Sequence, residues 1–474
     1  MPKNEREPEP TDTMKTLLIK NGEIINADSR QRADVLVEDG RIRRIGVGLE
    51  APEGAEVVNA RGRYLFPGFI DPHVHIHLPF MGTNAKDTYL SASRAAVVGG
   101  TTTLIEMCCP MGDESPLEAF SLWKGKADGK SLCDYTFHMG VSRYDAVAES
   151  ELREIVESGI SSFKIFLAYK GMFNLDDGSL FQVMRLAKKL GVIVAAHCEN
   201  AELVGQLQQE LLAAGKTGPR WHYHSRPPAV EAEGMHHLLT FAQMHGTHVY
   251  PVHTSCREAV EVALAARQKG VPVWIETLIQ FLTHDKTDAE KASFQGAKFV
   301  MSPPLREKSN QDYLWNGLQQ GSINTLATDH APFDFKGQKE MGRGDFTKIP
   351  NGIPSLEDRI TMFWTQGVET GRIDLHRFVD TASTAAAKIF GLFPRKGTIS
   401  VGADADIVIW DSKYRGKISH RTHHMDVDYN PYEGCKITGR PAQVYLRGEL
   451  VSDEGKPVGK PGYGEYQKRQ PTHF

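Results

Sequence analysis

The chain has 474 residues, a formal net charge of −4 and 40% hydrophobic residues, enough to bury one large core or two ordinary ones. It contains no apolar run of about 18 residues and no long run of lysine and arginine, which argues against a membrane span and against binding to nucleic acid or a membrane surface. Its six cysteines form neither a CxxC pair nor a disulfide-dense pattern, as is typical of a reducing compartment. We therefore expect a soluble, cytoplasmic globular protein.

The two ends of the chain differ from its middle. Residues 1–13 are charged and proline-rich, and we expect a disordered leader there. Short alternating strands broken by turn signals follow near the N-terminus and recur near the C-terminus. They predict one small β-sandwich domain built from residues 14–65 and 391–454. Residues 455–474 are rich in Gly, Lys and Pro and predict an extended C-terminal tail.

Between the two ends, residues 66–390 alternate between short apolar runs and stretches with apolar residues at helical spacing, as in 149–158, 180–190 and 257–269. A strand-then-helix pattern repeated this often predicts an α/β fold, the catalytic (β/α)8 TIM barrel. The eight expected strands are residues 68–75, 101–108, 134–141, 161–168, 192–197, 248–254, 271–276 and 324–329.

Six polar residues lie on these expected strands, at or near their carboxyl ends. Barrel enzymes assemble their sites at this face because the βα loops leave it open. Each residue alone also has a structural interpretation, such as a hydrogen-bonded core histidine or a helix cap, but an accidental convergence of four imidazoles and a carboxylate is improbable. We therefore predict a metal centre formed by His73, His75, Lys164, His197, His253 and Asp329.

Lys164 bears on the type of metal centre. Strand alternation places Lys164 and Phe166 on one side, which we expect to face the barrel interior. A buried ammonium without a partner is disfavoured and would repel cations. Reaction of the amine with carbon dioxide would give a carbamate, an anion whose two oxygens can bridge two metals. A salt bridge from Lys164 to Asp329 is the alternative that the sequence leaves open.

A series of longer motifs surrounds these residues. In them the chain resembles the dihydropyrimidinases, also called hydantoinases, of the cyclic amidohydrolase superfamily, from about residue 15 to the tail. The resemblance implies two divalent metal ions per subunit, which we expect to be zinc. It implies that His73, His75, Asp329 and the carbamylated Lys164 hold the buried ion, and that Lys164, His197 and His253 hold the outer one. The motifs include GFIDPHVH, GISSFKIFLAYKG, VIVAAHCENAELV, VMSPPLR, ATDHAPF and IPNGIPSLEDR.

The same resemblance implies a reaction. Tyr169 would polarise the carbonyl group, Ser302 and Asn351 would contact the substrate amide, and Asp329 would act as general base. The implied activity is hydrolysis of the cyclic amide bond of 5,6-dihydropyrimidines, such as dihydrouracil and dihydrothymine in pyrimidine catabolism, or of 5-substituted hydantoins. The products would be N-carbamoyl amino acids. The resemblance also implies a homotetramer.

The loops after strands one and four are expected to line the side of the pocket that meets the ring substituent. We expect a mostly apolar wall there, with His77 as the one polar residue. His77 precedes the Leu-Pro pair that breaks the strand, so we interpret it as a residue of the pocket mouth and not as a metal ligand. The expected lining residues are His77, Leu78, Phe80, Phe166, Met172 and Phe173.

Other interpretations stay open from the sequence. The chain could be another cyclic amidase of the allantoinase, dihydroorotase or imidase type, a non-catalytic dihydropyrimidinase-like scaffold, or a metal-free barrel protein. All six ligand positions are filled, which disfavours the scaffold. The Ser-Pro-Pro motif at Ser302 and the Asn-Gly pair at Asn351 favour the dihydropyrimidinase branch.

The tail contains three aromatic residues but too few apolar ones to fold alone. We expect Tyr463, Tyr466 and Phe474 to anchor on a neighbouring subunit.

Overall fold

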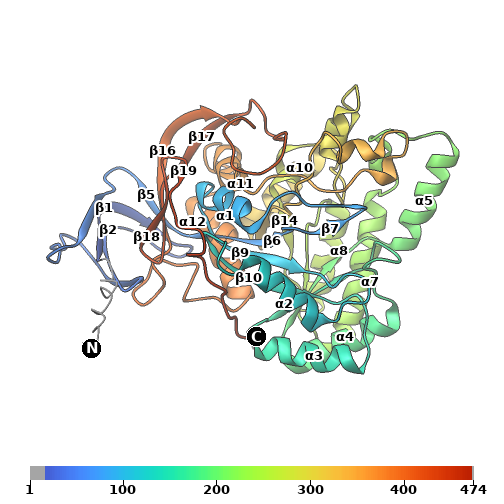
Figure 1. Ribbon diagram of the computed structural model, residues 1–474, viewed down its shortest axis with the longest axis horizontal. Coiled ribbons are helices and arrows are strands. Elements are labelled where there is room, and N and C mark those ends of the chain that lie inside the picture. The colour runs from blue at the N-terminus through green and yellow to red at the C-terminus, as the bar shows by residue number, and fades with distance from the viewer. Residues whose placement is uncertain (1–15, 472–474) are drawn as a thin grey trace, which may run out of the picture.

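The computed structural model describes residues 16–471, so the expected leader and Phe474 lie outside the described residues. The fold is a (β/α)8 barrel joined to a β-sandwich domain built from both chain ends, as predicted. In Figure 1 the blue strands of the N-terminal segment and the red strands of the C-terminal segment lie together on the left, and the barrel with its helices lies on the right. Among residues 16–471, no helix combines the length and the apolar character that a membrane crossing needs.

The two chain ends join through one strand pair. Strand β5 runs antiparallel to β16, with Leu65 opposite Ile409, so residues more than 300 positions apart share a sheet. The sheet order is β19-β18-β17-β16-β5-β1-β2-β3, with β4 paired to β1. Buried residues from both ends, such as Val35 and Ile407, form its core. The strands are β1 (Leu17–Ile25), β2 (Arg30–Glu38), β3 (Arg41–Gly46), β4 (Glu56–Asn59), β5 (Tyr64–Pro67), β16 (Ile407–Lys417), β17 (Lys436–Leu446), β18 (Glu449–Asp453) and β19 (Lys456–Pro457).

The barrel strands form two hydrogen-bonded groups. Six parallel strands follow the order β13-β12-β11-β10-β9-β6, and β14 pairs with β15. Isolated parallel bridges, Val249 to Val273 and Val74 to His330, join the two groups into a ring. The strands are β6 (Phe69–Val74), β9 (Thr101–Cys108), β10 (Asp134–Gly140), β11 (Ser162–Phe166), β12 (Ile193–His197), β13 (Val249–Pro251), β14 (Glu276–Leu278) and β15 (Thr325–Ala327). A small hairpin, β7 (Pro79–Phe80) and β8 (Thr83–Asn84), follows β6.

The seventh strand differs from the prediction. Residues 271–276 were expected, but the regular ladder begins only at Glu276. Pro272 has no N–H to donate, so this segment contacts β13 only through the Val249–Val273 bridge. The strand thus begins late, and Glu276 lies inside the barrel at its start.

The helices cover the barrel on its outer side (Figure 1). The three expected helical stretches correspond to α3, α4 and α8. Helix α4 shows why: Asp176 caps its first turn by accepting from the Ser179 N–H, and Gly191 ends it in the left-handed conformation. The helices are α1 (Tyr89–Val98), α2 (Pro116–Ala127), α3 (Ala146–Glu157), α4 (Asp177–Leu190), α5 (Ala201–Ala213), α6 (Trp221–His224), α7 (Pro228–His245), α8 (Arg257–Gln268), α9 (Ile279–Thr283), α10 (Ser309–Gln320), α11 (Arg359–Phe363), α12 (Leu375–Val379) and α13 (Ala385–Ile389).

Short turns of other helix types complete the loops. The 3-10 helices are η1 (Lys286–Glu290), η2 (Gln295–Phe299), η3 (Lys339–Gly342) and η4 (Phe346–Lys348), and the π-helical turns are η5 (Trp364–Val368) and η6 (Asp380–Thr384).

The predicted tail begins with strand β19, which belongs to the terminal sheet, and the residues after it pack on their own barrel. Tyr135 of β10 donates its N–H to Glu465 and accepts from the N–H of Gln467. The ring of Tyr466 stacks on Phe137 at 5.9 Å between centroids. Tyr466 thus packs on its own chain, and its expected contact with a neighbouring subunit stays a prediction.

Further along the tail, the guanidinium of Arg469 is buried near the amino-terminal ends of strands β10 and β11. It donates to Thr136 Oγ1 at 3.1 Å, to Ser162 Oγ at 3.0 Å and to the carbonyl of Phe137. Tyr463 also contacts its own chain, with the guanidinium of Arg447 lying 4.8 Å from its ring centroid. The tail thus closes its own barrel at the end opposite the strand C-termini.

Candidate active site

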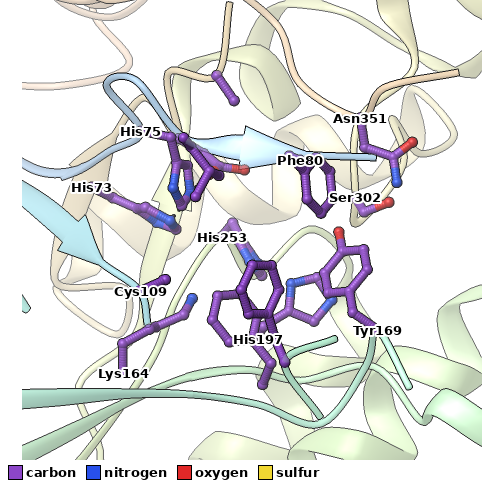
Figure 2. A pocket seen from close by; sticks show the side chains of 15 residues that line it. His73, His75, Phe80, Cys109, Lys164, Tyr169, His197, His253, Ser302 and Asn351 are labelled. Carbon is purple, nitrogen blue, oxygen red and sulfur yellow. Dashed lines mark ion pairs between the residues drawn. The ribbon is translucent and has the colours of Figure 1, made fainter. Parts of the chain in front are cut away.

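The six expected polar residues meet in one buried pocket at the carboxyl ends of the barrel strands. His73 lies on strand β6 and His75 just after it. Lys164 lies on β11 and His197 ends β12. His253 follows β13, and Asp329 follows β15. Figure 2 labels the four histidines and the lysine, whose side chains are directed towards the same space. None is more than 7% exposed. They are His73, His75, Lys164, His197, His253 and Asp329.

Three of these residues converge on one point. Oδ1 of Asp329 lies 3.0 Å from Nε2 of His73 and 2.9 Å from Nε2 of His75. One potential ligand atom from each residue lies within 4.8 Å of the other two. A buried imidazole pair with a carboxylate is a donor set for a divalent metal ion. The predicted cluster at the end of β6 and β15 is therefore present.

The remaining donors lie on the other side of the same space. The ring centroids of His197 and His253 are 4.6 Å apart, and those of His73 and His253 are 5.4 Å apart. Nδ1 of His253 is buried without a hydrogen-bond partner in the described part of the chain. A buried nitrogen of this kind is costly unless it coordinates something. These residues fit a second ion beside the first.

Lys164 is the least satisfied residue of the pocket. Its Nζ atom is buried, 4.4 Å from the ring centroid of Phe166, and has no hydrogen-bond partner within residues 16–471. Burial lowers the pKa of Lys164. No ion pair joins Lys164 to Asp329, whose carboxylate pairs with the two histidines instead. The salt bridge left open by the sequence is not formed.

A carboxylate that the sequence did not indicate forms hydrogen bonds with two of the cluster's histidine residues. Oε1 of Glu276 accepts from Nδ1 of His73 and from the backbone N–H of His253, each at 2.8 Å. Oε2 accepts from the hydroxyl of Tyr250 at 2.8 Å. The hydrogen bond from Nδ1 of His73 to Glu276 directs Nε2 of His73 towards Asp329. Glu276 is the last residue of the predicted seventh strand, but a single glutamate at a strand end does not by itself indicate this role.

The two carboxylates also set the charge of the histidines before any metal binds. Burial lowers the pKa of His73, but the charges of Asp329 and Glu276 outweigh it and raise this pKa to about 9. Burial lowers the pKa of His75 to about 4. The pKa of Asp329 lies well below its usual range because the attraction of His73 exceeds the effect of burial. At neutral pH the carboxylate of Asp329 is thus ionised, His75 is neutral and His73 is charged, so a cation that binds His73 must displace its proton.

A second supporting pair holds His197. Its Nε2 lies 2.7 Å from Oε2 of Glu199, which also accepts from Nη1 of Arg226 at 2.5 Å. The charge of Arg226 overcomes burial and brings the pKa of Glu199 to about 2. Glu199 lies two residues after His197, just past the end of β12. This spacing could have indicated that Glu199 is a hydrogen-bond partner of His197.

The opposite wall of the pocket carries the three residues expected to contact a substrate amide (Figure 2). Tyr169, Ser302 and Asn351 all line the pocket. Burial raises the pKa of Tyr169 to about 12, so its phenol is a hydrogen-bond donor at neutral pH. Oδ1 of Asn351 is buried and, in the described chain, has no donor facing it. This wall therefore offers the Tyr169 phenol as a donor and Oδ1 of Asn351 as a free acceptor.

Four of the six residues expected on the substituent side also line the pocket, and they make it aromatic. The rings of Phe166 and Phe173 stack at 5.0 Å, and Phe80 meets Tyr169 edge-on at 5.3 Å. The four are Leu78, Phe80, Phe166 and Phe173.

The structure does not place His77 or Met172 in this pocket. The backbone at His77 is left-handed, with φ of 57°, and its N–H donates to the carbonyl of Asp87. This turn directs the imidazole into a separate cavity beside Lys126. Met172 is 42% exposed. The polar residue expected at the pocket mouth therefore lies elsewhere.

The fold and the buried cluster together define a (β/α)8-barrel protein with a divalent-metal site. Comparison with known proteins agrees, because residues 64–451 match the amidohydrolase family. The chain belongs to the amidohydrolase family.

Individual relatives extend over nearly the whole chain. The D-hydantoinase of Geobacillus stearothermophilus is 50% identical over 455 residues, which are 96% of this chain and 96% of that protein. The dihydropyrimidinase of Rattus norvegicus is 38% identical over 96% of this chain and 89% of its own length. The solved D-hydantoinase (dihydropyrimidinase) from Thermus sp. is 58% identical, with a TM-score of 0.95 over 97% of this chain and 100% of that one.

Proposed function

We propose that this protein hydrolyses the cyclic amide bond of 5-substituted hydantoins and 5,6-dihydropyrimidines to N-carbamoyl amino acids. The observation that carries the proposal is one pocket with a metal-binding cluster on one wall and an amide-binding wall, formed by Tyr169, Ser302 and Asn351, opposite it. The names of the relatives, D-hydantoinase and dihydropyrimidinase, support the same reaction.

Two divalent ions, zinc in this proposal, would be held by the six polar residues of the pocket. His73, His75 and Asp329 would hold one ion, His197 and His253 would hold the other, and Lys164, as a carbamate, would serve as a ligand to both. When bound, the ions supply a water of lowered pKa and a positive charge near the substrate carbonyl.

The carbamate resolves the position of Lys164. Burial favours the neutral amine. Its nitrogen attacks carbon dioxide, an N–C bond forms and one proton leaves, which gives an anion with two oxygens. The carbamate would replace an unpartnered buried amine by an anion whose oxygens can bind cations.

The protein's own groups then move protons and orient the ring. Asp329 is ionised, so it accepts a proton from the attacking water and returns it to the departing amide nitrogen. The phenol of Tyr169 donates a hydrogen bond to the oxyanion that develops on the carbonyl oxygen. The free Oδ1 of Asn351 accepts from a ring N–H. Aromatic walls exclude water and tolerate several ring substituents.

The pocket also argues against the other interpretations. A dihydroorotase or allantoinase needs a cation for a carboxylate or ureido arm, but the residues that line the described pocket include no arginine, and Lys164 is their only lysine. A non-catalytic scaffold would not require six buried potential metal ligands or the carboxylates that form hydrogen bonds with them.

The test is a substrate panel combined with metal analysis. The purified protein should contain about two zinc ions per subunit, the number proposed for this site, and should hydrolyse dihydrouracil or a hydantoin. Asp329→Asn should lose more turnover than metal, whereas Asp113→Asn, on an exposed loop, should match the wild type. Stoichiometric zinc without turnover of any dihydropyrimidine, hydantoin or cyclic imide would reject the proposed reaction.

We further propose a cytoplasmic homotetramer, as the family resemblance implies. Light scattering coupled to gel filtration measures the mass of the assembly directly, and a monomeric mass would reject it.

A further inference from the structure

A second buried lysine, outside the metal cluster, lies behind the amide-binding wall. Lys339 begins the 3-10 helix η3 and is 0% exposed. Its Nζ donates to three backbone carbonyls, those of Val300 at 2.8 Å, Pro350 at 2.6 Å and Gly352 at 2.7 Å. No carboxylate within the described chain forms an ion pair with it.

Three carbonyl contacts from one nitrogen require three N–H donors. Only the ammonium form of lysine has three, because the neutral amine has two and one lone pair. The geometry therefore describes a charged Lys339, held by carbonyl dipoles alone. Burial opposes this charge and lowers the pKa of Lys339 well below its usual value. Replacing such a group by an apolar side chain would relieve that cost.

The three carbonyls belong to the two segments that contact the substrate in the proposed reaction. Val300 lies two residues before Ser302, and Pro350 and Gly352 lie on either side of Asn351. A direct bond from the Gly352 N–H to the Val300 carbonyl, at 3.0 Å, joins the same segments. One ammonium thus connects both halves of the amide-binding wall.

The fit around this connection is close. The backbone at Gly352 has φ of 152°, and a Cβ atom there would lie 2.3 Å from the carbonyl oxygen of Ala331, two residues after Asp329. The amide-binding wall therefore rests directly on the segment that carries the metal-binding carboxylate. A shift of the wall would change the distance from the ring amide to the metal cluster.

We propose that Lys339 is a positioning residue that fixes Ser302 and Asn351 relative to each other and to the metal cluster, so that the ring amide binds at the correct place. This inference rests on the proposed function. It assigns Lys339 no contact with substrate or metal. Its loss should weaken binding and orientation of the ring and leave the metal content unchanged.

A purely structural lysine would behave differently. Its removal would change stability or yield, but each metal-loaded subunit would keep wild-type KM and kcat. The readout is therefore KM and kcat per metal-loaded subunit, measured with the best ring substrate of the wild type.

The variant is Lys339→Met, which keeps an unbranched side chain one atom shorter than lysine and removes its donors. The matched control is Lys336→Met, an exposed lysine of the same loop. We expect kcat/KM of Lys339→Met to fall by about 10- to 100-fold, mainly through KM, as for a binding group displaced by roughly 1 Å. Zinc content should equal that of the wild type, and the control should be unchanged. Wild-type KM and kcat in Lys339→Met would overturn the inference.

Should Lys339→Met fail to fold, hydrogen exchange on the wild-type holoenzyme decides. A ring that the enzyme binds but does not hydrolyse should slow exchange in residues 300–302 and 350–353 together. Slowing in only one segment, or in neither, would overturn the inference. Failure of the proposed function has a different signature, since the wild type itself would then hydrolyse no ring.

Discussion

Replacement of Glu276 by glutamine tests whether a carboxylate behind the cluster controls metal affinity. The change is nearly isosteric. The glutamine oxygen can still accept from His73 Nδ1 and from the His253 N–H, and its amide can donate to the Tyr250 hydroxyl, which can pass its own proton to Thr325 Oγ1 at 2.6 Å. The substitution therefore removes one negative charge and leaves every buried partner satisfied.

The expected magnitude follows from these contacts. A hydrogen bond to a charged group contributes about 1.5–3 kcal/mol, and a neutral one about 1 kcal/mol. Loss of this difference at His73, about 0.5–2 kcal/mol, predicts a metal affinity weakened by about 2- to 30-fold, which overlaps the roughly 10- to 100-fold range known for partners of metal-binding histidines. Turnover at saturating zinc should change less, because the proposed proton carrier, Asp329, remains.

Competition between the apo-protein and a chelator of known zinc affinity measures the effect. Glu106→Gln is the matched control. Glu106 is equally buried, but its carboxyl group accepts from the backbone N–H of Ile76 and not from a metal-binding histidine, and burial raises its pKa well above the usual range. Zinc affinity equal to wild type in Glu276→Gln would refute the reasoning and leave Glu276 as a packing residue.

Four more predictions follow from other parts of the molecule. Lys164→Ala should lose zinc and turnover, with partial recovery in added short carboxylic acids; elemental analysis showing two ions would contradict this. His77→Leu should leave the kcat/KM ratio of dihydrouracil to 5-phenylhydantoin unchanged, because its ring lies in another cavity. Arg469→Met should lower the free energy of unfolding in urea by about 2–4 kcal/mol; an unchanged midpoint would show that the tail adds no stability. Burial raises the pKa of Asp358 to about 8, so the wild type loses stability between about pH 4 and 8, and the Tm of Asp358→Asn should rise relative to wild type over that interval.

The barrel was predictable because its local signals agree. Apolar runs of strand length alternate with helices that carry their own caps, as Asp176 and Gly191 do for α4. The docked tail was not predictable. Tyr466 and Arg469 occur in a polar segment, and the surface that receives them is formed by β10 and β11, more than 300 residues earlier. Composition contains no information about such a long-range contact.

The six pocket residues could be predicted because the rule about strand ends acts on residue type and position together. Glu276 and Lys339 could not. Glutamate beside a strand and lysine in a polar loop are ordinary in sequence, and only their burial and partners distinguish them. The break of the strand at His77 was predictable, but the direction of the side chain was not, because it depends on the left-handed backbone at His77, with φ of 57°.

The breaks in the barrel ladder explain how the cluster can form at all. Strand β13 ends at Pro251 and β15 at Ala327, each two residues before a pocket residue, although the apolar pattern predicted strands that continue to both. His253 and Asp329 then adopt left-handed backbone, with φ of 41° and 48°. Each such residue costs about 1–3 kcal/mol and persists only where the surroundings enforce it. A continuous ladder would direct successive side chains alternately inward and outward, and the reversal at these two points turns an imidazole and a carboxylate towards the same space. The shortened strands are therefore part of the site, and a substitution that extended the ladder there would remove the metal-binding geometry while it made the barrel more regular.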